Sequence, residues 1–230
     1  IDPDNEPNSG EKIEELLLNL GYTVGYTNNF DDVENYSYHA IFVTLGVWGG
    51  GANYVLQEDD VQGLVDYLNN GGNLYMEGGD TWYFDNATSL HPYFFIDPVS
   101  DGTNDLGMVQ GVEGTFSEGV NNEYVGHNNY IDHLAPQGDA FTVFRNDEVG
   151  YNCGIAYEGS YKTIGTSFIF GGLENTSVEK MEILQNILDY FITTTDEWLS
   201  ILPSNGSVGA GESCNTKFII NSSLLPNVGT

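Results

Sequence analysis

Two apolar stretches decide the fold: Tyr38-His-Ala-Ile-Phe-Val-Thr-Leu45 and Asn73-Leu-Tyr-Met-Glu77. The first is an almost unbroken apolar run, which is typical of a strand buried on both faces of a parallel sheet. Residues 58–69 lie between the two and repeat apolar side chains at helical spacing: Val61, Leu64, Val65 and Leu68. A strand, a helix and a strand in this order predict a right-handed βαβ unit with parallel strands.

The flanking sequence continues this alternation of helices and strands. Residues 11–20 predict a helix that ends at Gly21, and residues 22–26 a short strand. Residues 154–170 predict a hairpin that turns at Glu158-Gly159-Ser160. Residues 177–192 predict a closing helix, which Thr176 and Glu179 begin as a capping box.

Residues 86–150 interrupt the alternation, because they are rich in Gly, Asn, Asp and aromatic residues. We interpret them as an insertion of short strands and long loops, with His91–Ile96 and Ala140–Phe144 as candidate strands. The expected fold class is α/β: a mostly parallel, flavodoxin-like sheet with helices on both faces and this β-rich insertion.

The sequence pattern changes again after residue 193. Residues 198–212 read as a strand and a turn, and residues 216–221 as another strand. A β-sandwich module needs about 100 residues, so residues 194–230 are expected to be a linker and the beginning of an immunoglobulin-like β domain. The α/β domain is expected to occupy residues 1–193.

The charge is strongly one-sided. The 230 residues include 5 Lys and Arg against 34 Asp and Glu, for a formal net charge of -29. Such a surface repels phosphate backbones and anionic lipids, which excludes nucleic-acid binding and polybasic membrane docking. No apolar run approaches the roughly 20 residues of a membrane span. Ca²⁺ is the expected counter-ion and the one candidate cofactor.

The composition also indicates a compartment. Few Lys residues, 29 Gly residues and many Asn, Thr and Tyr residues suit a secreted or cell-surface bacterial protein. Adaptation to high salt is the alternative explanation of the acidity. Charged residues make up only 17% of the chain, which is low for a salt-adapted surface, so we favour an extracellular location.

Three phrases carry a resemblance to a known family. They are Asn8-Ser9-Gly10, Asn70-Gly-Gly-Asn-Leu-Tyr-Met-Glu-Gly-Gly-Asp80, and the stretch from Ser160 to Glu174 with the helix after it. Through them, residues 1–193 resemble the class I glutamine amidotransferase-like, flavodoxin-related domains of large secreted bacterial proteins. The tail resembles the start of the immunoglobulin-like repeats of such proteins.

The resemblance implies a site whose reactive groups are missing. Active members place a cysteine on the turn after a central strand, where this chain has Gly78-Gly79-Asp80. Active members also have a Phe-His-Pro-Glu-like motif after a late strand. The matching residues in this chain are Phe170-Gly-Gly-Leu-Glu174, which lack the histidine. Cys153 lies in the hairpin region, away from that turn. A thiol needs a nearby base to attack a carbonyl, so we expect no catalytic residue of this type.

Three other groups of residues suggest binding. Asp2 and Asp4 before the first helix and Asp80 after the second strand of the βαβ unit are candidate metal ligands, because hard oxygen ligands at strand ends suit Ca²⁺ or Mg²⁺. The alternative is a solvated acidic loop. Trp48, Trp82 and Tyr83 also follow strand ends and are candidate ligand-binding residues that stack on a sugar ring, against the alternative of packing residues. His127 and His133 form a weak candidate metal pair in a polar loop, or a plain surface pair.

The first strand of a flavodoxin-like sheet is central, yet only its last residues, Ile1-Asp2, are present. Either that strand precedes this stretch, or the topology differs, or another segment fills the place. Residues 216–221 are apolar enough to donate such a strand to a neighbouring copy, which predicts a homo-oligomer formed by strand exchange. Other domains of the same parent protein are the alternative partners.

These observations leave three hypotheses for function. The first is a non-catalytic structural or interaction module of a secreted protein, within an extracellular assembly. The second is a hydrolase, or the accessory domain of a secreted peptidase, with a carboxylate or metal site. The third is a carbohydrate-binding module.

Overall fold

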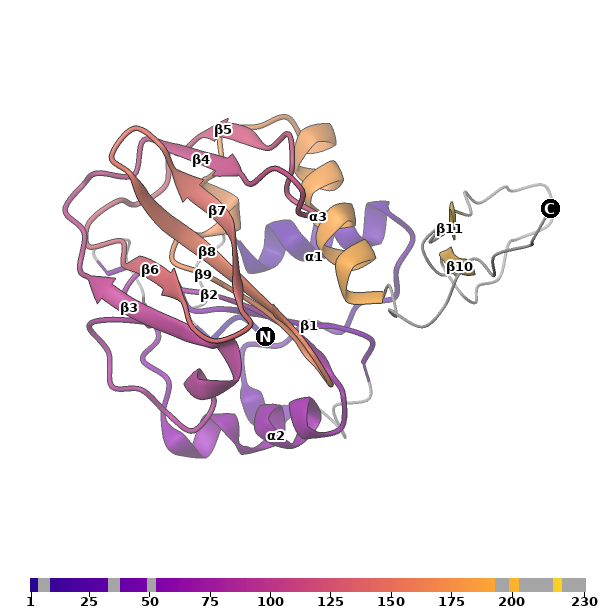
Figure 1. Ribbon diagram of the computed structural model, residues 1–230. Helices are drawn as coiled ribbons and strands as arrows, with labels where there is room; N and C mark the ends of the chain where they lie inside the picture. Colours follow the sequence, from indigo (N-terminus) through magenta and orange to yellow (C-terminus); the bar gives the residue numbers. More distant parts are fainter. Residues whose placement is uncertain (4–8, 33–37, 49–52, 193–198, 203–216, 221–230) are drawn as a thin grey trace, which may run out of the picture.

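The computed structural model describes residues 1–3, 9–32, 38–48, 53–192, 199–202 and 217–220 (Figure 1). Its α-helices are α1 (Gly10–Asn19), α2 (Glu58–Asn69) and α3 (Ser177–Ile192), and its short 3₁₀ helices are η1 (Phe30–Asp32), η2 (His91–Phe94) and η3 (Phe170–Gly172). Its strands are β1 (Ile41–Thr44), β2 (Asn73–Glu77), β3 (Ile96–Ser100), β4 (Met108–Gly111), β5 (Asn121–Glu123), β6 (His133–Pro136), β7 (Phe141–Asn146), β8 (Tyr151–Glu158), β9 (Lys162–Thr166), β10 (Leu199–Leu202) and β11 (Lys217–Ile220).

The main sheet has nine strands in the order β1-β2-β9-β8-β7-β4-β5, with β6 paired to β3 and to β8. Strands β1, β2 and β9 run parallel, with Val43 opposite Met76 and Met76 opposite Gly165. The predicted βαβ unit is therefore confirmed in β1, α2 and β2. The predicted hairpin is confirmed as well, because β8 and β9 pair antiparallel.

The expected mostly parallel, flavodoxin-like sheet is wrong. Among the described strands of the main sheet, every pairing other than β1–β2 and β2–β9 is antiparallel, so the sheet is mixed. The reason lies in the connections: short loops and hairpins join neighbouring strands antiparallel, whereas parallel strands need a crossover. The 86–150 insertion is not an appendage either, because its strands β3 to β7 extend the sheet beyond β8.

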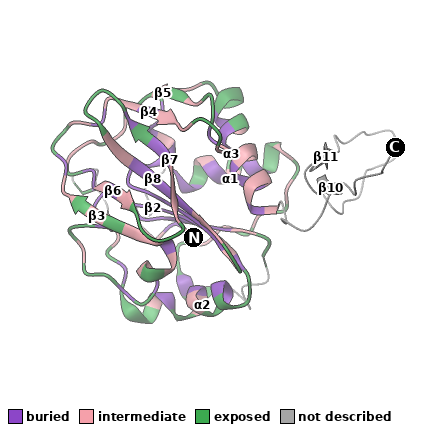
Figure 2. Cartoon of the chain, in the orientation of Figure 1, coloured by how far each residue is buried: buried purple, intermediate pink, exposed green. Residues whose placement is uncertain are grey.

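The helices lie on two sides of the sheet (Figure 1). Helices α1 and α3 bury Leu16 and Leu184 in a cluster that includes Tyr75 of β2. Helix α2 buries Leu64 in a second cluster, which includes Met76 of the same strand. Tyr75 and Met76 are adjacent and point to opposite faces, as successive strand residues do. Both faces of the central strands are therefore buried (Figure 2).

The local predictions agree with the helices better than with the short strands. Helix α2 has the predicted bounds, and Gly21 takes the positive φ of 88° that ends α1. The Thr176 capping box is confirmed, because the Thr176 N–H donates to Glu179 and the Glu179 N–H to the Thr176 hydroxyl. The candidate strand at residues 91–96 is wrong, since most of it forms η2. Residues 22–26 form no strand.

Ile1 and Asp2 lie beside β1. The Ile1 amino group donates to the Phe42 carbonyl at 2.7 Å, the Thr44 N–H donates to the Ile1 carbonyl at 3.0 Å, and the Asp2 N–H donates to Thr27 at 2.9 Å. Strand β11 pairs antiparallel with β10 in a sheet of its own. Strand exchange between copies therefore stays a prediction. Of the helices described, none is long and apolar enough to cross a membrane.

Candidate functional site

Three loops meet at the carboxyl ends of β1 and β2. The Gly79 N–H donates to the Gly46 carbonyl at 2.9 Å, and the Asp132 N–H donates to the Gly79 carbonyl at 3.0 Å. A Cβ atom on Gly79 would lie 2.7 Å from Val47 Cγ1, so only glycine allows this approach. The loops after β1 and β2 and the loop before β6 therefore form one connected surface.

Asp80 lies within this surface. Its Oδ2 accepts the backbone N–H of Trp48 at 2.9 Å, and the residue is 5% exposed. Burial, with a smaller contribution from the nearby carboxylates of Asp85 and Asp101, raises the pKa of Asp80 to about 6, although the Trp48 N–H lowers it. At neutral pH this carboxyl is mostly ionised, so the loop after β1 is held by a charge-assisted hydrogen bond.

Asp132 lies beneath the same loops and is fully buried. Its Oδ2 accepts the N–H groups of Trp82 at 2.9 Å and Tyr83 at 2.8 Å. Its Oδ1 has no hydrogen-bond partner, and neither has the buried hydroxyl of Thr81. Burial raises the pKa of Asp132 to about 8, so this carboxyl is largely protonated at neutral pH.

Four aromatic side chains rise from these loops into solvent. They are Trp48 (51% exposed), Tyr83 (49%), Phe84 (70%) and Tyr130 (41%), and we name them the aromatic edge. The rings of Trp48 and Tyr130 meet edge to face, 5.3 Å apart. Tyr130 has a φ of 59°, which disfavours a bulky residue. Strain of this kind concentrates at functional sites.

The predicted ligand-binding residues divide between the surface and the core. Trp48 and Tyr83 belong to the aromatic edge. Trp82 is a packing residue, the alternative left open above: it is 6% exposed and its indole N–H donates to the Thr166 carbonyl at 2.9 Å. Tyr130 and Phe84 were missed: nothing near Tyr130 in sequence marks a strand end that it shares with Trp48.

Of the predicted metal ligands, Asp2 and Asp80 already accept hydrogen bonds from other parts of the chain. Asp2 is buried, and its carboxylate accepts the hydroxyls of Thr44 at 2.9 Å and Tyr26. Asp4 lies outside the described residues, and Asp80 belongs to the loops described above. Within the described part of the chain, no group of three or more His, Cys, Asp or Glu side chains is arranged to hold a metal ion. Calcium binding stays a prediction.

A second buried carboxyl was also missed by the sequence interpretation. Glu77, the last residue of β2, accepts the Tyr75 hydroxyl at 2.7 Å and the Phe170 N–H at 2.8 Å. Its Oε1 has no partner, and burial raises its pKa to about 7. The only sequence signal was a charged residue at the end of an otherwise buried strand.

A hydrogen-bonded chain of Ser100, His133 and Asp105 lies close to this region. The Ser100 hydroxyl is 3.1 Å from His133 Nδ1, and Asp105 Oδ2 is 3.1 Å from His133 Nε2. The ring of Tyr151 stacks on the imidazole at a centroid distance of 3.6 Å. His133 begins β6 rather than lying in a polar loop, and no sequence spacing connects these three residues.

The thiol of Cys153 lies in β8 and not at the Gly78-Gly79-Asp80 turn, and Cys214 lies outside the described residues. Cys153 is fully buried in β8, and burial raises its pKa well above the ordinary value. The turn at Gly78-Gly79-Asp80 presents a carboxyl instead. The structure thus places no thiol of the described residues at the turn where the resemblance expects one.

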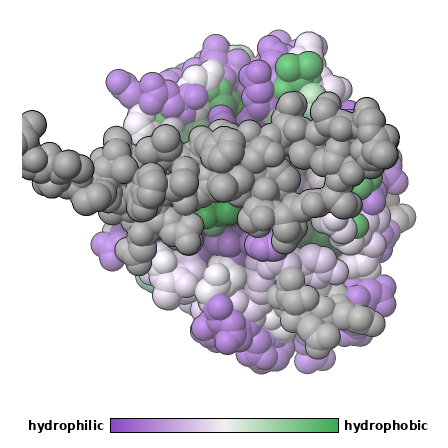
Figure 3. Space-filling model, turned by 90° about the vertical axis from the view of Figure 1, so that its right-hand side faces the viewer, coloured by the Kyte–Doolittle hydropathy of each residue, from purple (hydrophilic) through white to green (hydrophobic). Residues whose placement is uncertain are grey.

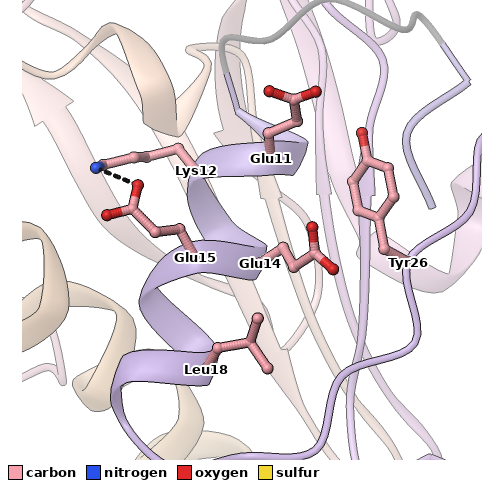
Figure 4. A pocket seen from close by; sticks show the side chains of 6 residues that line it. All are labelled: Glu11, Lys12, Glu14, Glu15, Leu18 and Tyr26. Carbon is pink, nitrogen blue, oxygen red and sulfur yellow. Dashed lines mark hydrogen bonds and ion pairs between the residues drawn. The ribbon is translucent and has the colours of Figure 1, made fainter.

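A pocket of about 490 Å³ lies at another surface, between α1 and Tyr26 (Figure 4). Glu11, Glu14 and Glu15 line it, and Lys12 pairs with Glu15 at 2.8 Å. The Tyr26 hydroxyl already donates to Asp2. We interpret this pocket as a solvated acidic face. Figure 3 shows another view of the surface, on which purple hydrophilic side chains and green hydrophobic patches both lie beside the grey segments.

No family model matches the chain, and no curated protein matches it. Solved structures do. Gan42B, a GH42 beta-galactosidase, matches with a TM-score of 0.53 at 14% identity, over 83% of this chain and 27% of that chain. The exo-beta-1,4-mannosidase Op5Man5 from Opitutaceae bacterium strain TAV5 matches with a TM-score of 0.52 at 14% identity, over 85% of this chain and 33% of that chain. The N-terminal domain of mmIFT52 matches with a TM-score of 0.54 at 12% identity, over 84% of this chain and 97% of that chain.

At these identities the matches show a shared fold and nothing more. The chain spans about a quarter of the length of Gan42B and a third of Op5Man5. These comparisons also overturn the resemblance to class I glutamine amidotransferase-like domains: no family model supports it, and the matched structures are parts of glycosidases and mmIFT52. The mixed sheet overturns the flavodoxin-like description that came with it.

Proposed function

We propose that this chain is a non-catalytic interaction module of a secreted acidic protein and that it binds carbohydrate at the aromatic edge. The observation that carries the proposal is the pair of exposed rings of Trp48 and Tyr130, which meet on loops held by backbone hydrogen bonds and by Asp80. Sugar rings present apolar C–H faces and polar hydroxyls. Exposed aromatic rings beside carboxylates match both parts.

The energetics support a binding role for these rings. Each exposed ring leaves apolar area in water, and covering that area releases roughly 25 cal/mol per Å². Tyr130 also keeps a disfavoured backbone conformation. A residue needed only for packing has no reason to keep both a strained backbone and an exposed ring, whereas a ligand that covers the ring offsets both costs.

The acidic groups beneath the edge support binding rather than catalysis. An acid catalyst must reach the atom that it protonates. Asp132 has a raised pKa, as a general acid would, yet it is fully buried and its Oδ2 is occupied by two backbone N–H groups. Its place indicates a supporting role for the loop that carries Tyr83. Two of the matched structures are named as glycosidases, which is compatible with a carbohydrate ligand.

A glycan array followed by calorimetry tests the proposal. We expect Trp48→Ala to weaken binding of the glycan found by at least about tenfold, because one aromatic contact and its area are lost. Tyr38→Ala is the matched control, since Tyr38 is 43% exposed and precedes β1, whereas Trp48 follows it. Equal effects of the two substitutions, or no glycan bound by the native chain, would refute the proposal.

A hydrolase is the second candidate, and the Ser100–His133–Asp105 chain favours it. In this arrangement Nδ1 faces the serine and Nε2 the carboxylate, the reverse of the usual serine hydrolase geometry. A fluorophosphonate probe decides the matter. Covalent labelling that Ser100→Ala removes and Ser89→Ala leaves would establish a nucleophile. An unlabelled protein would leave these residues a structural hydrogen-bond chain.

A further inference from the structure

We propose that Glu77 is a pH-sensitive latch: in its protonated form it fastens η3 to the end of β2, and in its ionised form it releases that segment to water. The inference is separate from the proposed carbohydrate binding and does not depend on it. It comes from a fully buried carboxyl that has one unpaired oxygen and holds the backbone of η3 directly.

Glu77 lies in a row of buried polar side chains at the carboxyl ends of the parallel strands. Thr44 of β1 lies opposite it on one side, and Thr166 of β9 lies opposite it on the other. The three residues are each 2% exposed or less. Water therefore reaches the carboxyl only if a neighbouring segment moves.

One oxygen of this carboxyl is fully used and the other is not. Oε2 accepts the Tyr75 hydroxyl at 2.7 Å and the Phe170 N–H at 2.8 Å. Within the described part of the chain, Oε1 has no hydrogen-bond partner. Both oxygens of a carboxylate carry its charge, so ionised Glu77 buries charge that nothing pairs. Protonation at Oε1 removes this charge and leaves both bonds to Oε2 in place.

The middle residue of η3 is joined to two helices. The Gly171 N–H donates to the Ser9 hydroxyl at 2.8 Å, directly before α1, and the Gly171 carbonyl accepts a hydrogen bond from Lys180 of α3 at 3.0 Å. These contacts follow immediately after the Phe170 N–H that Glu77 holds. Loss of the Glu77 bond therefore frees the residue that attaches η3 to β2.

The last residue of η3 holds the loop after β5. The Gly172 carbonyl accepts the N–H groups of Val125 at 2.9 Å and Gly126 at 3.2 Å. Release of η3 removes the acceptor of both groups. We therefore expect the loop and η3 to open together, so that the amides of Val125 and Gly126 report on the latch as those of Phe170 and Gly171 do.

The titratable groups around Glu77 do not compensate its charge. Tyr75 faces it on its own strand and Tyr124 faces it after β5; burial raises the pKa of both hydroxyls well above the ordinary value, so both stay neutral near pH 7. Asp2, on the β1 side, adds a negative charge that raises the pKa of Glu77. Lys180, on the α3 side, donates to η3 itself.

The direction of the switch follows from the pKa. Burial raises the pKa of Glu77 from 4.5 to about 7, although hydrogen bonds from Ser9, Phe170 and Tyr75 lower it. A raised pKa in the closed form stabilises that form fully below pH 4.5, and this contribution is lost as the pH rises through 7. An open form in which Glu77 regains its ordinary pKa therefore becomes about tenfold more populated between pH 6 and pH 8.

Amide hydrogen exchange of the native protein at pH 6 and pH 8 tests the latch, with rates corrected for the intrinsic effect of pH. We expect the opening of the Phe170, Gly171, Val125 and Gly126 amides to increase about tenfold, and that of the Ile155 amide in β8 to change by less than about twofold. Equal opening at both pH values overturns the inference. An equal increase at every amide indicates global unfolding and overturns it as well.

Glu77→Gln assigns the effect to this carboxyl. Glutamine keeps an oxygen that accepts the Tyr75 and Phe170 hydrogen bonds but does not ionise, so amide opening should be the same at both pH values. Glu123→Gln removes one charge at an exposed position of β5, close to the latch, and should keep the increase. An increase that persists in Glu77→Gln belongs to another group and overturns the assignment.

A carbon NMR titration of the native protein gives a readout that needs no substitution. The Glu77 carboxyl resonance should titrate with a midpoint near pH 7, and amide opening should follow the same midpoint. A midpoint near the ordinary value of 4.5 overturns the inference, whether or not Glu77→Gln folds.

Discussion

Replacing Asp132 with asparagine removes the charge that burial disfavours most at the candidate site. Asparagine has nearly the same shape, and its carbonyl oxygen can still accept the N–H groups of Trp82 and Tyr83. Only the titration of the side chain is lost. The substitution therefore isolates the electrostatic cost of Asp132 from its hydrogen bonds.

The magnitude follows from the pKa of Asp132, which burial raises from 3.8 to about 8. A carboxyl with a raised pKa in the folded state holds its proton more tightly there than in the unfolded chain. Its contribution to stability is therefore complete below pH 3.8 and is lost as the pH rises to 8. At about 1.4 kcal/mol per pKa unit, the full loss is on the order of 6 kcal/mol, of which about 4 kcal/mol falls between pH 5 and pH 9.

Urea unfolding followed by tryptophan fluorescence measures this difference. We expect the stability of Asp132→Asn relative to the native protein to rise by at least about 2 kcal/mol from pH 5 to pH 9, which allows for relaxation around the ionised carboxylate. Asp97→Asn controls for the loss of one charge from a chain of net charge -29. A relative stability that does not change with pH would show that Asp132 ionises freely in the folded protein and would refute the reasoning.

Two further substitutions separate stability from binding at the aromatic edge. Trp82→Phe removes the indole N–H bond to Thr166 and part of a buried ring, so thermal denaturation should show a loss of stability of about 1–3 kcal/mol. The affinity for the glycan should stay within about twofold. A large loss of affinity in a folded variant would place Trp82 in the site. Tyr130→Gly relieves the φ of 59°, so stability should change by no more than about 1 kcal/mol while binding falls at least about tenfold. Unchanged binding in Tyr130→Gly would remove Tyr130 from the aromatic edge.

Position after a strand end predicted some of the exposed aromatic residues of the candidate site, but not all of them. Trp48 and Tyr83 follow strand ends, and both are exposed there. Trp82 is adjacent to Tyr83 and is equally close to the strand end, yet its side chain enters the core, where its N–H bonds to Thr166. The orientation of neighbouring side chains in a loop depends on what packs against them, so proximity to a strand end alone does not separate the two.

Residues distant in sequence complete the site. Tyr130 and Asp132 lie about 50 residues after Asp80, in a segment interpreted as an insertion. They join the site because the Asp132 N–H bonds to Gly79 and the Tyr130 ring meets Trp48. Asp2 has other partners, the hydroxyls of Thr44 and Tyr26, and no spacing in the sequence predicted them.

Local sequence patterns predicted the three α-helices, the βαβ unit of β1, α2 and β2, and the β8–β9 hairpin. Each depends on residues close together in the chain: apolar side chains that repeat with the period of the element, capping residues and turn glycines. Contacts between distant segments, in contrast, make the sheet mixed, extend it with the strands of residues 96–146, and bring the loops of Asp80, Asp132 and Tyr130 together. Strand partners and the burial of a carboxyl depend on contacts between distant segments, and no local pattern specifies those contacts.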